Sequence, residues 1–323
     1  MNIFLAVLLF IVGVVLVIKG GDLFVDAATW IAERSGIPKV IIGATIVSLA
    51  TTMPELLVSV MAATEGKVDM SIGNAVGSVT ANIALIMAIS LIFMPGVIKR
   101  KDYLAKSVLM VIAAALVAVS GVKGEVGLLI SFVLMVVFFV FMYENIREVK
   151  KTVSGNKAEN EGNKEKTPSS KKILAINITK FVVGALFIVL GSRLLVDKGS
   201  LLARMAGVPE RVIGVTFIAV GTSLPELITT VTAIVKKESS LSIGNILGAN
   251  IIDLTLIMPL SALISGKALP VSPALAQVDL PFCLIVCLIA VLPAMIRSKF
   301  SRWQGVLLLA SYASYLAYTF VAA

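Results

Sequence analysis

Long apolar runs separated by short polar segments make up most of the chain. A helix that spans a bilayer needs about 20 mostly apolar residues. Ten runs have this character, at about residues 3–32, 39–64, 70–95, 104–121, 125–143, 173–205, 210–235, 241–265, 274–296 and 302–322. The pattern predicts an all-α polytopic membrane protein with ten transmembrane helices.

One segment is clearly polar, at residues 144–172. It carries eight Lys or Arg and five Glu, together with Gly, Asn, Ser and Pro. This composition is typical of a solvated linker rather than of a packed element. We therefore expect five helices over residues 1–143, a linker loop over 144–172 and five further helices over 173–323.

The composition excludes several classes of protein. Hydrophobic residues make up 58% of the 323 residues and charged residues 15%, against about 45–50% and about 25% in soluble domains. This excludes a soluble enzyme, a disulfide-stabilised secreted domain and a disordered chain. The chain has no His, which rules out imidazole metal sites and Ser-His catalysis. Cys283 and Cys287 lie four residues apart on one helix face, where we expect packing rather than metal binding.

The Lys and Arg residues predict the orientation in the membrane. If the N-terminus lies outside and the spans alternate, 19 of the 28 Lys and Arg residues fall in inside loops and five in outside loops. Cytoplasmic loops carry such an excess. We expect a multi-pass protein of the plasma membrane with both termini outside and the 144–172 loop in the cytoplasm. The net charge of +9 then follows from topology and requires no nucleic-acid partner.

The two halves of the chain match each other at an offset of 171 residues. Residues 43–60 align with 214–231, with Pro-Glu-Leu in each, and residues 71–82 align with 242–253, with Ser-Ile-Gly-Asn in each. The offset contains five predicted spans. Because five is odd, the second half enters the membrane in the opposite direction. The sequence thus predicts two inverted five-helix repeats, an architecture of many secondary transporters.

Each repeat places a glutamate in the middle of a span, directly after a proline. A charge near the bilayer centre costs about 2.5–3.5 kcal/mol on insertion scales, so we expect Glu55 and Glu226 to face a cavity and meet cations. Pro54 and Pro225 lack an amide hydrogen, which frees a carbonyl in the preceding turn. A broken helix with carbonyl, hydroxyl and carboxylate oxygens suits hard cations such as Ca²⁺ and Na⁺.

The next span of each repeat carries polar residues on a face rich in glycine. Glycines recur there at intervals of four residues, which permits close helix packing. The polar positions are Asn74, Ser78 and Asn82 in the first repeat, matched by Asn245, Ala249 and Asp253 in the second. Asp253 is a third acid within a span, and structural need alone does not explain three membrane-embedded carboxylates.

These motifs resemble the alpha-repeats of the cation/calcium exchanger superfamily. ATTMPEL at 50–56 and GTSLPEL at 221–227 are similar to the Na⁺/Ca²⁺ exchanger branch, including its prokaryotic members. The H⁺/Ca²⁺ branch typically has Gly-Asn-x-x-Glu there. The resemblance covers nearly the whole chain, and it implies an antiporter rather than an enzyme, with no cofactor and with Ca²⁺ and Na⁺ as transported substrates.

The resemblance also implies a set of ion ligands. Glu55 and Glu226 would bind Ca²⁺ and share in Na⁺ binding. The other ligands would be the hydroxyls or carbonyls of Thr51, Thr52, Thr222 and Ser223, the main-chain oxygens of Ser48 and Ala219, and the side chains of Ser78, Asn82 and Asp253.

One departure from the family pattern leaves the coupling ion open. Ala249 matches Ser78 in the repeat but stands where the branch usually has a hydroxyl, which removes one oxygen from an outer Na⁺ site. Na⁺/Ca²⁺ exchange and H⁺/Ca²⁺ or broader cation exchange are therefore both hypotheses. A non-transporting membrane enzyme or a channel is a third. We expect alternating access in a functional monomer. The long first and sixth spans resemble gate helices, on which Asp22 and Arg193 could pair.

Overall fold

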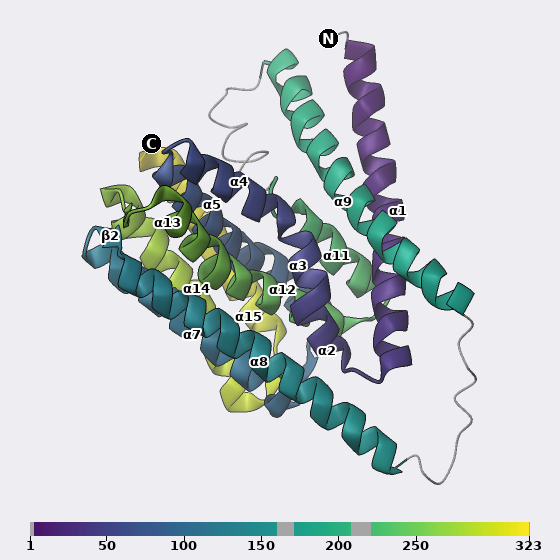
Figure 1. Cartoon of the computed structure of the whole chain (residues 1–323). Coiled ribbons are helices and arrows are strands. Elements are labelled where there is room, and N and C mark those ends of the chain that lie inside the picture. Colours follow the sequence, from purple (N-terminus) through teal and green to yellow (C-terminus); the bar gives the residue numbers. More distant parts are fainter. Residues whose placement is uncertain (1–2, 160–170, 208–220, 323) are drawn as a thin grey trace.

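The computed structural model describes residues 3–159, 171–207 and 221–322. These residues are mostly helical (Figure 1). The first half contains α1 (Ile3–Ser35), α2 (Lys39–Ile42), the π-helical turn η1 (Gly43–Val47), α3 (Ser48–Thr51), α4 (Met53–Thr64), α5 (Val68–Ala81), the π-helical turn η2 (Asn82–Met87), α6 (Ala88–Phe93), α7 (Arg100–Val122) and α8 (Leu128–Glu159). The second half contains α9 (Lys171–Met205), α11 (Leu224–Val235), α12 (Ser239–Ile252), η4 (Asp253–Ile257), α13 (Met258–Ser265), η5 (Leu275–Asp279), α14 (Leu280–Arg297) and α15 (Arg302–Ala322).

Two short antiparallel ladders join loops from the two halves at the helix ends. Strand β1 (Gly96–Val97) pairs with β4 (Lys299–Phe300), and β2 (Glu125–Val126) pairs with β3 (Leu269–Pro270). Each ladder therefore connects an end of the first half to an end of the second.

Most of the predicted spans are present as apolar helices. In the described part of the chain, seven helices are long and apolar enough to cross a membrane, or eight if the bent pair Lys39–Thr51 and Met53–Thr64 is one span. They coincide with eight of the ten predicted spans. Of the other two, 210–235 lies partly outside the described residues and 302–322 corresponds to α15. The prediction of an all-helical polytopic membrane protein is confirmed.

Helix α8 is longer than the hydropathy pattern predicts. It continues to Glu159, into the segment predicted as a linker, and α9 begins at Lys171. An ion pair supports this extension, because the buried Lys106 Nζ lies 2.7 Å from Glu148 Oε2. The polar residues at this end of α8 therefore continue a helix beyond its apolar part, which hydropathy alone does not distinguish from a loop.

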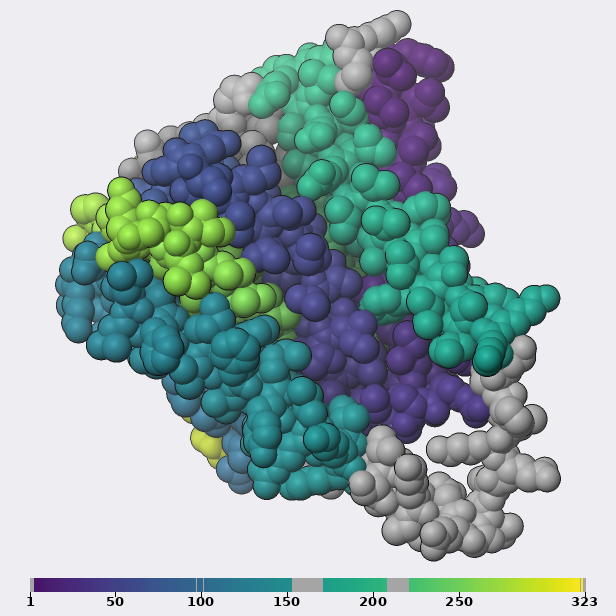
Figure 2. Space-filling view, in the orientation of Figure 1, coloured from purple at the N-terminus to yellow at the C-terminus, as the bar shows by residue number. Residues whose placement is uncertain are grey.

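Helices α1 and α9 run in opposite directions and form a layer beside the main bundle (Figures 1 and 2). Glycines make the contact between them. A Cβ on Gly20 would lie 2.9 Å from the carbonyl oxygen of Gly184, and a Cβ on Gly191 would lie 2.9 Å from the carbonyl oxygen of Gly13. The two glycines of each helix are seven residues apart, so the contact recurs on the same face. The two backbones touch because no side chain separates them.

Helix α12 is buried along most of its length within the main bundle. Two of its glycines face the segment that leads to the first Pro-Glu motif. A Cβ on Gly244 would meet the carbonyl oxygen of Val40, and one on Gly248 would lie 2.5 Å from the carbonyl oxygen of Ala44. The predicted close packing is present at these two glycines, and it positions the first motif against α12. It is absent at the matching Gly73 and Gly77 of α5, where a Cβ would meet no atom nearer than 4.0 Å.

Candidate ion-binding site

The first Pro-Glu motif lies at a bend in the chain. α3 ends at Thr51, α4 begins at Met53, and the two helical segments differ in direction by 47°. Pro54 lies in the first turn of α4, where a missing amide hydrogen leaves no helical bond unmade. Glu55 follows in the same turn. The predicted helix break is therefore present, with Thr51 just before it, Thr52 at it and Glu55 just after it.

The second motif also lies at the start of a helix, α11. Residues 221–223 form a turn, and Glu226 lies in the first turn of the helix that begins at Leu224. The Leu224 amide donates a hydrogen bond of 3.4 Å to the carbonyl of Gly221. This carbonyl, four residues before Pro225, is the one that the proline leaves without its helical partner, and it accepts one long hydrogen bond. Ala219, whose main-chain oxygen is a predicted ligand, lies outside the described residues.

Three carboxylates are buried around these two breaks. Glu55 is 1% exposed, and Glu226 and Asp253 are 0% exposed. The charge of Glu55 interacts with those of Glu226 and Asp253. Both carboxylate oxygens of Glu55, both of Asp253 and Oε2 of Glu226 make no hydrogen bond within the described part of the chain. Buried anions without partners cost several kcal/mol each, so this arrangement fits positive charge.

Hydroxyl groups connect the two motifs to each other and to α5. Thr52 Oγ1 donates to Glu226 Oε1 at 3.4 Å, which joins the first motif to the second. Ser78 Oγ on α5 lies 3.4 Å from Thr222 Oγ1. Ser223 is fully buried, and its Oγ has no hydrogen-bond partner among the described residues. The structure thus brings four of the predicted hydroxyl ligands into the region of Glu226.

Asn82 and Asp253 occupy matching places where a helix changes to a π-helical turn. η2 begins at Asn82 and η4 begins at Asp253. Such turns are frequent at functional sites. Both residues are buried, and none of their side-chain polar atoms is hydrogen-bonded to a described residue. Their oxygens are therefore free to coordinate an ion. Ser48, whose main-chain oxygen is a predicted ligand, is also fully buried.

Two asparagines outside the predicted site hold its helices in place. Asn74 Nδ2 donates to the carbonyl oxygen of Glu55 at 3.1 Å and to Ser59 Oγ at 2.9 Å. Asn245 Oδ1 accepts a hydrogen bond of 3.2 Å from Thr51 Oγ1. Both belong to the Ser-Ile-Gly-Asn sequence that recurs in each half, and this recurrence is the signal that could have identified them.

A fourth membrane-embedded acid, Asp279, is absent from the predicted site. Its Oδ1 accepts a hydrogen bond of 2.6 Å from the Tyr315 hydroxyl. Both residues line a cavity of about 700 Å³ that also borders Ser78 and Thr222. An anion in such a cavity attracts cations towards its far end. The signal that could have identified Asp279 is an acid within an apolar run.

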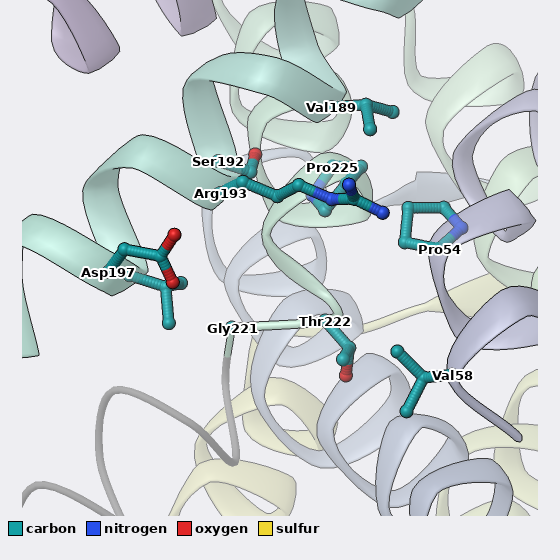
Figure 3. Close-up of a pocket in the computed structure, with 10 residues that line it drawn as sticks. Pro54, Val58, Val189, Ser192, Arg193, Asp197, Gly221, Thr222 and Pro225 are labelled. Carbon is teal, nitrogen blue, oxygen red and sulfur yellow. The ribbon is translucent and has the colours of Figure 1, made fainter. Parts of the chain in front are cut away.

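A smaller cavity, of about 150 Å³, lies between α9 and the two motif prolines. Figure 3 shows Arg193 on α9 extending towards Pro54 and Pro225 across this space. The predicted pair between Asp22 and Arg193 is wrong, because α1 packs against the end of α11 and Asp22 Oδ1 lies 3.3 Å from Lys236 Nζ instead.

The donor set of this region is that of a hard cation. Among the described residues, no group of three His, Cys, Asp or Glu side chains could hold a metal ion by itself. A cation between Glu55 and Glu226 would therefore also need hydroxyl and carbonyl oxygens, which are the ligands that Ca²⁺ accepts. Cys283 and Cys287 are free thiols in the apolar core, as predicted.

Comparison with known proteins places the chain in a family. It matches the sodium/calcium exchanger protein family over residues 5–147 and 176–321. The chain belongs to this family. An uncharacterized membrane protein of Methanocaldococcus jannaschii is 32% identical to this member of the exchanger family, over 94% of each chain. The sodium/calcium exchanger MaX1 of Methanosarcina acetivorans is 29% identical, over 97% of this chain and 98% of its own length.

A solved structure of an exchanger has the same fold. The sodium-calcium exchanger NCX_Mj, soaked with Na⁺ and Sr²⁺, aligns with a TM-score of 0.79 and 27% identity, over 98% of this chain and 99% of its own. The resemblance to the prokaryotic exchanger branch is thereby confirmed. This member of the sodium/calcium exchanger family is a membrane transporter and not an enzyme.

Proposed function

We propose that the protein is an antiporter that exchanges Na⁺ for Ca²⁺ across the membrane by alternating access. The observation that carries this proposal is the buried pair Glu55 and Glu226, one in each Pro-Glu motif, with Thr52 of the first motif hydrogen-bonded to Glu226 of the second. Two carboxylates balance the two charges of one Ca²⁺ or a set of Na⁺ ions. The similarity to the exchangers MaX1 and NCX_Mj supports Na⁺ as the counter-ion.

Ca²⁺ and the counter-ion would compete for overlapping oxygens around the two glutamates. The further ligands would come from Ser48, Thr51, Thr52, Ser78, Asn82, Ala219, Thr222, Ser223 and Asp253. Without an ion, two like charges would face each other in a medium of low dielectric constant, which opposes closure around them. This barrier would favour exchange over uncoupled passage.

The proposal includes ten spans arranged as two inverted five-helix repeats. Helices α1 and α9 match at the offset of 171 residues and run in opposite directions (Figure 1), which supports the inversion. The excess of Lys and Arg in the loops predicted to be cytoplasmic supports a plasma-membrane protein with both termini outside the cell. Ten spans can enclose a site within one chain, so a monomer would suffice.

Uptake of ⁴⁵Ca²⁺ tests the proposed exchange. Proteoliposomes loaded with Na⁺ and diluted into Na⁺-free buffer are expected to accumulate Ca²⁺, whereas vesicles without a gradient are not. A parallel arm carries a pH gradient and no Na⁺. Ca²⁺ flux that needs neither gradient and survives the change Glu55→Gln would identify a channel and overturn the proposal.

Exchange of H⁺ for Ca²⁺ is the second candidate, and Ala249 favours it. This residue is fully buried in α12 and carries no oxygen at the position that matches Ser78. Uptake driven by the pH gradient alone would mean that the missing hydroxyl has removed a Na⁺ site.

Under the proposed Na⁺ coupling, the change Ala249→Ser is expected to lower the Na⁺ concentration for half-maximal exchange. One neutral oxygen ligand contributes about 0.5–1.5 kcal/mol, which corresponds to about a two- to tenfold decrease. Na⁺-dependent Ca²⁺ efflux measures it. Ala262→Ser, at a fully buried position of α13, is the matched control. An unchanged Na⁺ dependence would mean that residue 249 does not face the ion path.

The change Asp279→Asn is expected to raise the Ca²⁺ concentration for half-maximal uptake about two- to tenfold, with little change in the maximal rate. The reason is that a carboxylate in the larger cavity concentrates cations before they reach the site. Tyr315→Phe removes the hydrogen bond and keeps the acid, so it should have a smaller effect on that concentration. A fall in maximal rate alone would contradict the expectation.

A further inference from the structure

An ion-pair cluster ties α1 to the end of α11. Lys236, which follows the last residue of α11, places its Nζ 2.7 Å from Asp26 Oδ1 and 3.3 Å from Asp22 Oδ1 of α1. A Cβ on the adjacent Gly21 would lie 2.5 Å from Thr232 Oγ1 of α11. Burial lowers the pKa of Lys236, but the hydrogen bonds and charges of Asp26 and Asp22 raise it more. The lysine therefore stays charged, and α1 is closed against α11 here.

The sequence repeat relates the Asp22–Lys236 pair of this cluster to a second pair of positions with reversed charges, whereas Asp26 corresponds to Asp197 and keeps its sign. At the offset of 171 residues, Asp22 corresponds to Arg193 and Lys236 corresponds to Glu65. Both charges change sign. The negative Asp22 on the first long helix is matched by the positive Arg193, and the positive Lys236 at a helix end is matched by the negative Glu65. The two positions of each pair therefore carry opposite charges in both halves, although neither residue is the same in the two halves. A change of sign at only one of the two positions would have lost this complementarity.

The backbone at the two helix ends is the same. Glu65 follows α4 with φ −81° and ψ 0°, and Lys236 follows α11 with φ −85° and ψ 1°. The Glu65 amide donates to the carbonyl of Met61 at 3.0 Å, and the Lys236 amide donates to the carbonyl of Thr232 at 2.9 Å. Met61 and Thr232 also differ by the offset of 171. The two ends are therefore structural equivalents, and each presents its charge in the same way.

In this conformation, the contact between α1 and α11 is closed, whereas the equivalent contact between α9 and α4 is open. α1 is in contact with α11, whereas a cavity of about 150 Å³, lined by Arg193 and Asp197 of α9 and by Pro54 and Val58 of α4, lies between α9 and α4 (Figure 3). Glu65 is paired instead with Lys67, at 2.7 Å and with both side chains more than half exposed.

We propose that Glu65 and Arg193 form the ion pair that closes their face of the protein when the Lys236 cluster on the opposite face opens. This inference rests on the alternating access of the proposed function. If the two halves exchange conformations, α9 must approach α4 as α1 now approaches α11, which brings Arg193 to Glu65. Each end state is then stabilised by an ion pair at its closed face.

A second ion pair shows the same reversal in the sequence. Lys39 Nζ lies 2.8 Å from Glu238 Oε1, on the face that carries Lys236. The offset assigns Glu210 and Lys67 as the counterparts of Lys39 and Glu238. Glu210 lies outside the described residues, and the proposal does not depend on it. Charge complementarity is thus kept between the halves at two separate pairs of positions.

Labelling of a cysteine in the cavity tests this proposal without measuring transport. Val196 lines the cavity beside Arg193 and is half-buried, so Val196→Cys reports how open this face is to an uncharged, membrane-impermeant maleimide. In that background, Glu65→Lys and Arg193→Glu should each raise the labelling rate about two- to fivefold, the range that one exposed ion pair provides. The two changes together should return the rate to that of the background, because the pair is restored with its charges exchanged.

Two further variants complete the test. Lys236→Gln should lower the labelling rate by a similar factor, because it weakens the pair that closes the opposite face. Lys267→Gln, at an exposed lysine before β3, should change nothing. The proposal is overturned if the double variant keeps the raised rate of the single ones, or if neither single change alters labelling. Na⁺-driven ⁴⁵Ca²⁺ uptake by the same vesicles reports on the proposed function separately, since labelling requires no ion exchange.

Discussion

Glu226→Gln is expected to abolish Ca²⁺ uptake while leaving the protein folded. The change keeps the shape of the side chain and removes one of the two charges that would balance Ca²⁺. Loss of one partner from a buried ionic site costs about 3–5 kcal/mol, which is more than about a 100-fold loss of affinity. Na⁺-driven ⁴⁵Ca²⁺ uptake measures the effect, and Glu55→Gln should behave in the same way.

A measurement of stability separates lost binding from lost folding. Ca²⁺ is expected to raise the melting temperature of the wild-type protein, because a ligand that binds the folded state stabilises it. This increase should vanish in Glu226→Gln, whose melting temperature without ions should equal or exceed that of the wild type, since a buried anion is removed. Glu125→Gln, at an exposed position in β2, should leave uptake unchanged. Normal uptake by Glu226→Gln would place the site elsewhere.

Gly244→Ala is expected to cause the second large loss, through packing rather than chemistry. A Cβ at this position would meet the carbonyl oxygen of Val40 and lie 3.0 Å from its Cα. Both are backbone atoms, so the neighbour cannot move aside as a side chain can. Overpacking typically costs about 1–3 kcal/mol. The displaced segment leads directly to Thr51 and Glu55, and a shift of about 1 Å near a reacting site costs about 100-fold.

The melting temperature and the uptake rate of Gly244→Ala check this expectation together. The matched control is Gly127→Ala, where a Cβ would lie 3.8 Å from Glu125 Oε1, an ordinary contact. The control should keep both properties. If Gly244→Ala were as stable and as active as the wild type, α2 and α12 would have room to separate, and their close contact would not position the motif.

Sequence reasoning succeeded where the signal is local. Apolar runs predict spans because the bilayer imposes a length, and the prolines before Glu55 and Glu226 predict breaks because their rings remove a hydrogen bond. The family followed from the same motifs, since their spacing recurs in both halves. The ligand roles of the individual side chains stay predictions, although the structure buries the described ones and leaves several of their oxygens without partners.

The features that sequence reasoning missed depend on contacts between distant segments. Asp279 is held by Tyr315, 36 residues further along the chain, and no local pattern indicates that contact. The Lys236 cluster joins residues 210 positions apart. The predicted Asp22–Arg193 pair assumed that matching residues of the two gate helices meet. Helices that run in opposite directions, with Gly20 against Gly184, do not bring those two positions together.

The glycine contact between α1 and α9 implies that the two helices move together as one rigid unit. Its repetition after seven residues on both helices prevents one from sliding past the other, because backbone would meet side chain at the next step. Any displacement that takes Asp22 away from Lys236 therefore carries Arg193 with it. Under the proposed cycle, opening one face and closing the other would be one movement rather than two that must be synchronised. The efficiency with which one ion gradient drives the other would then depend on four residues that never contact an ion.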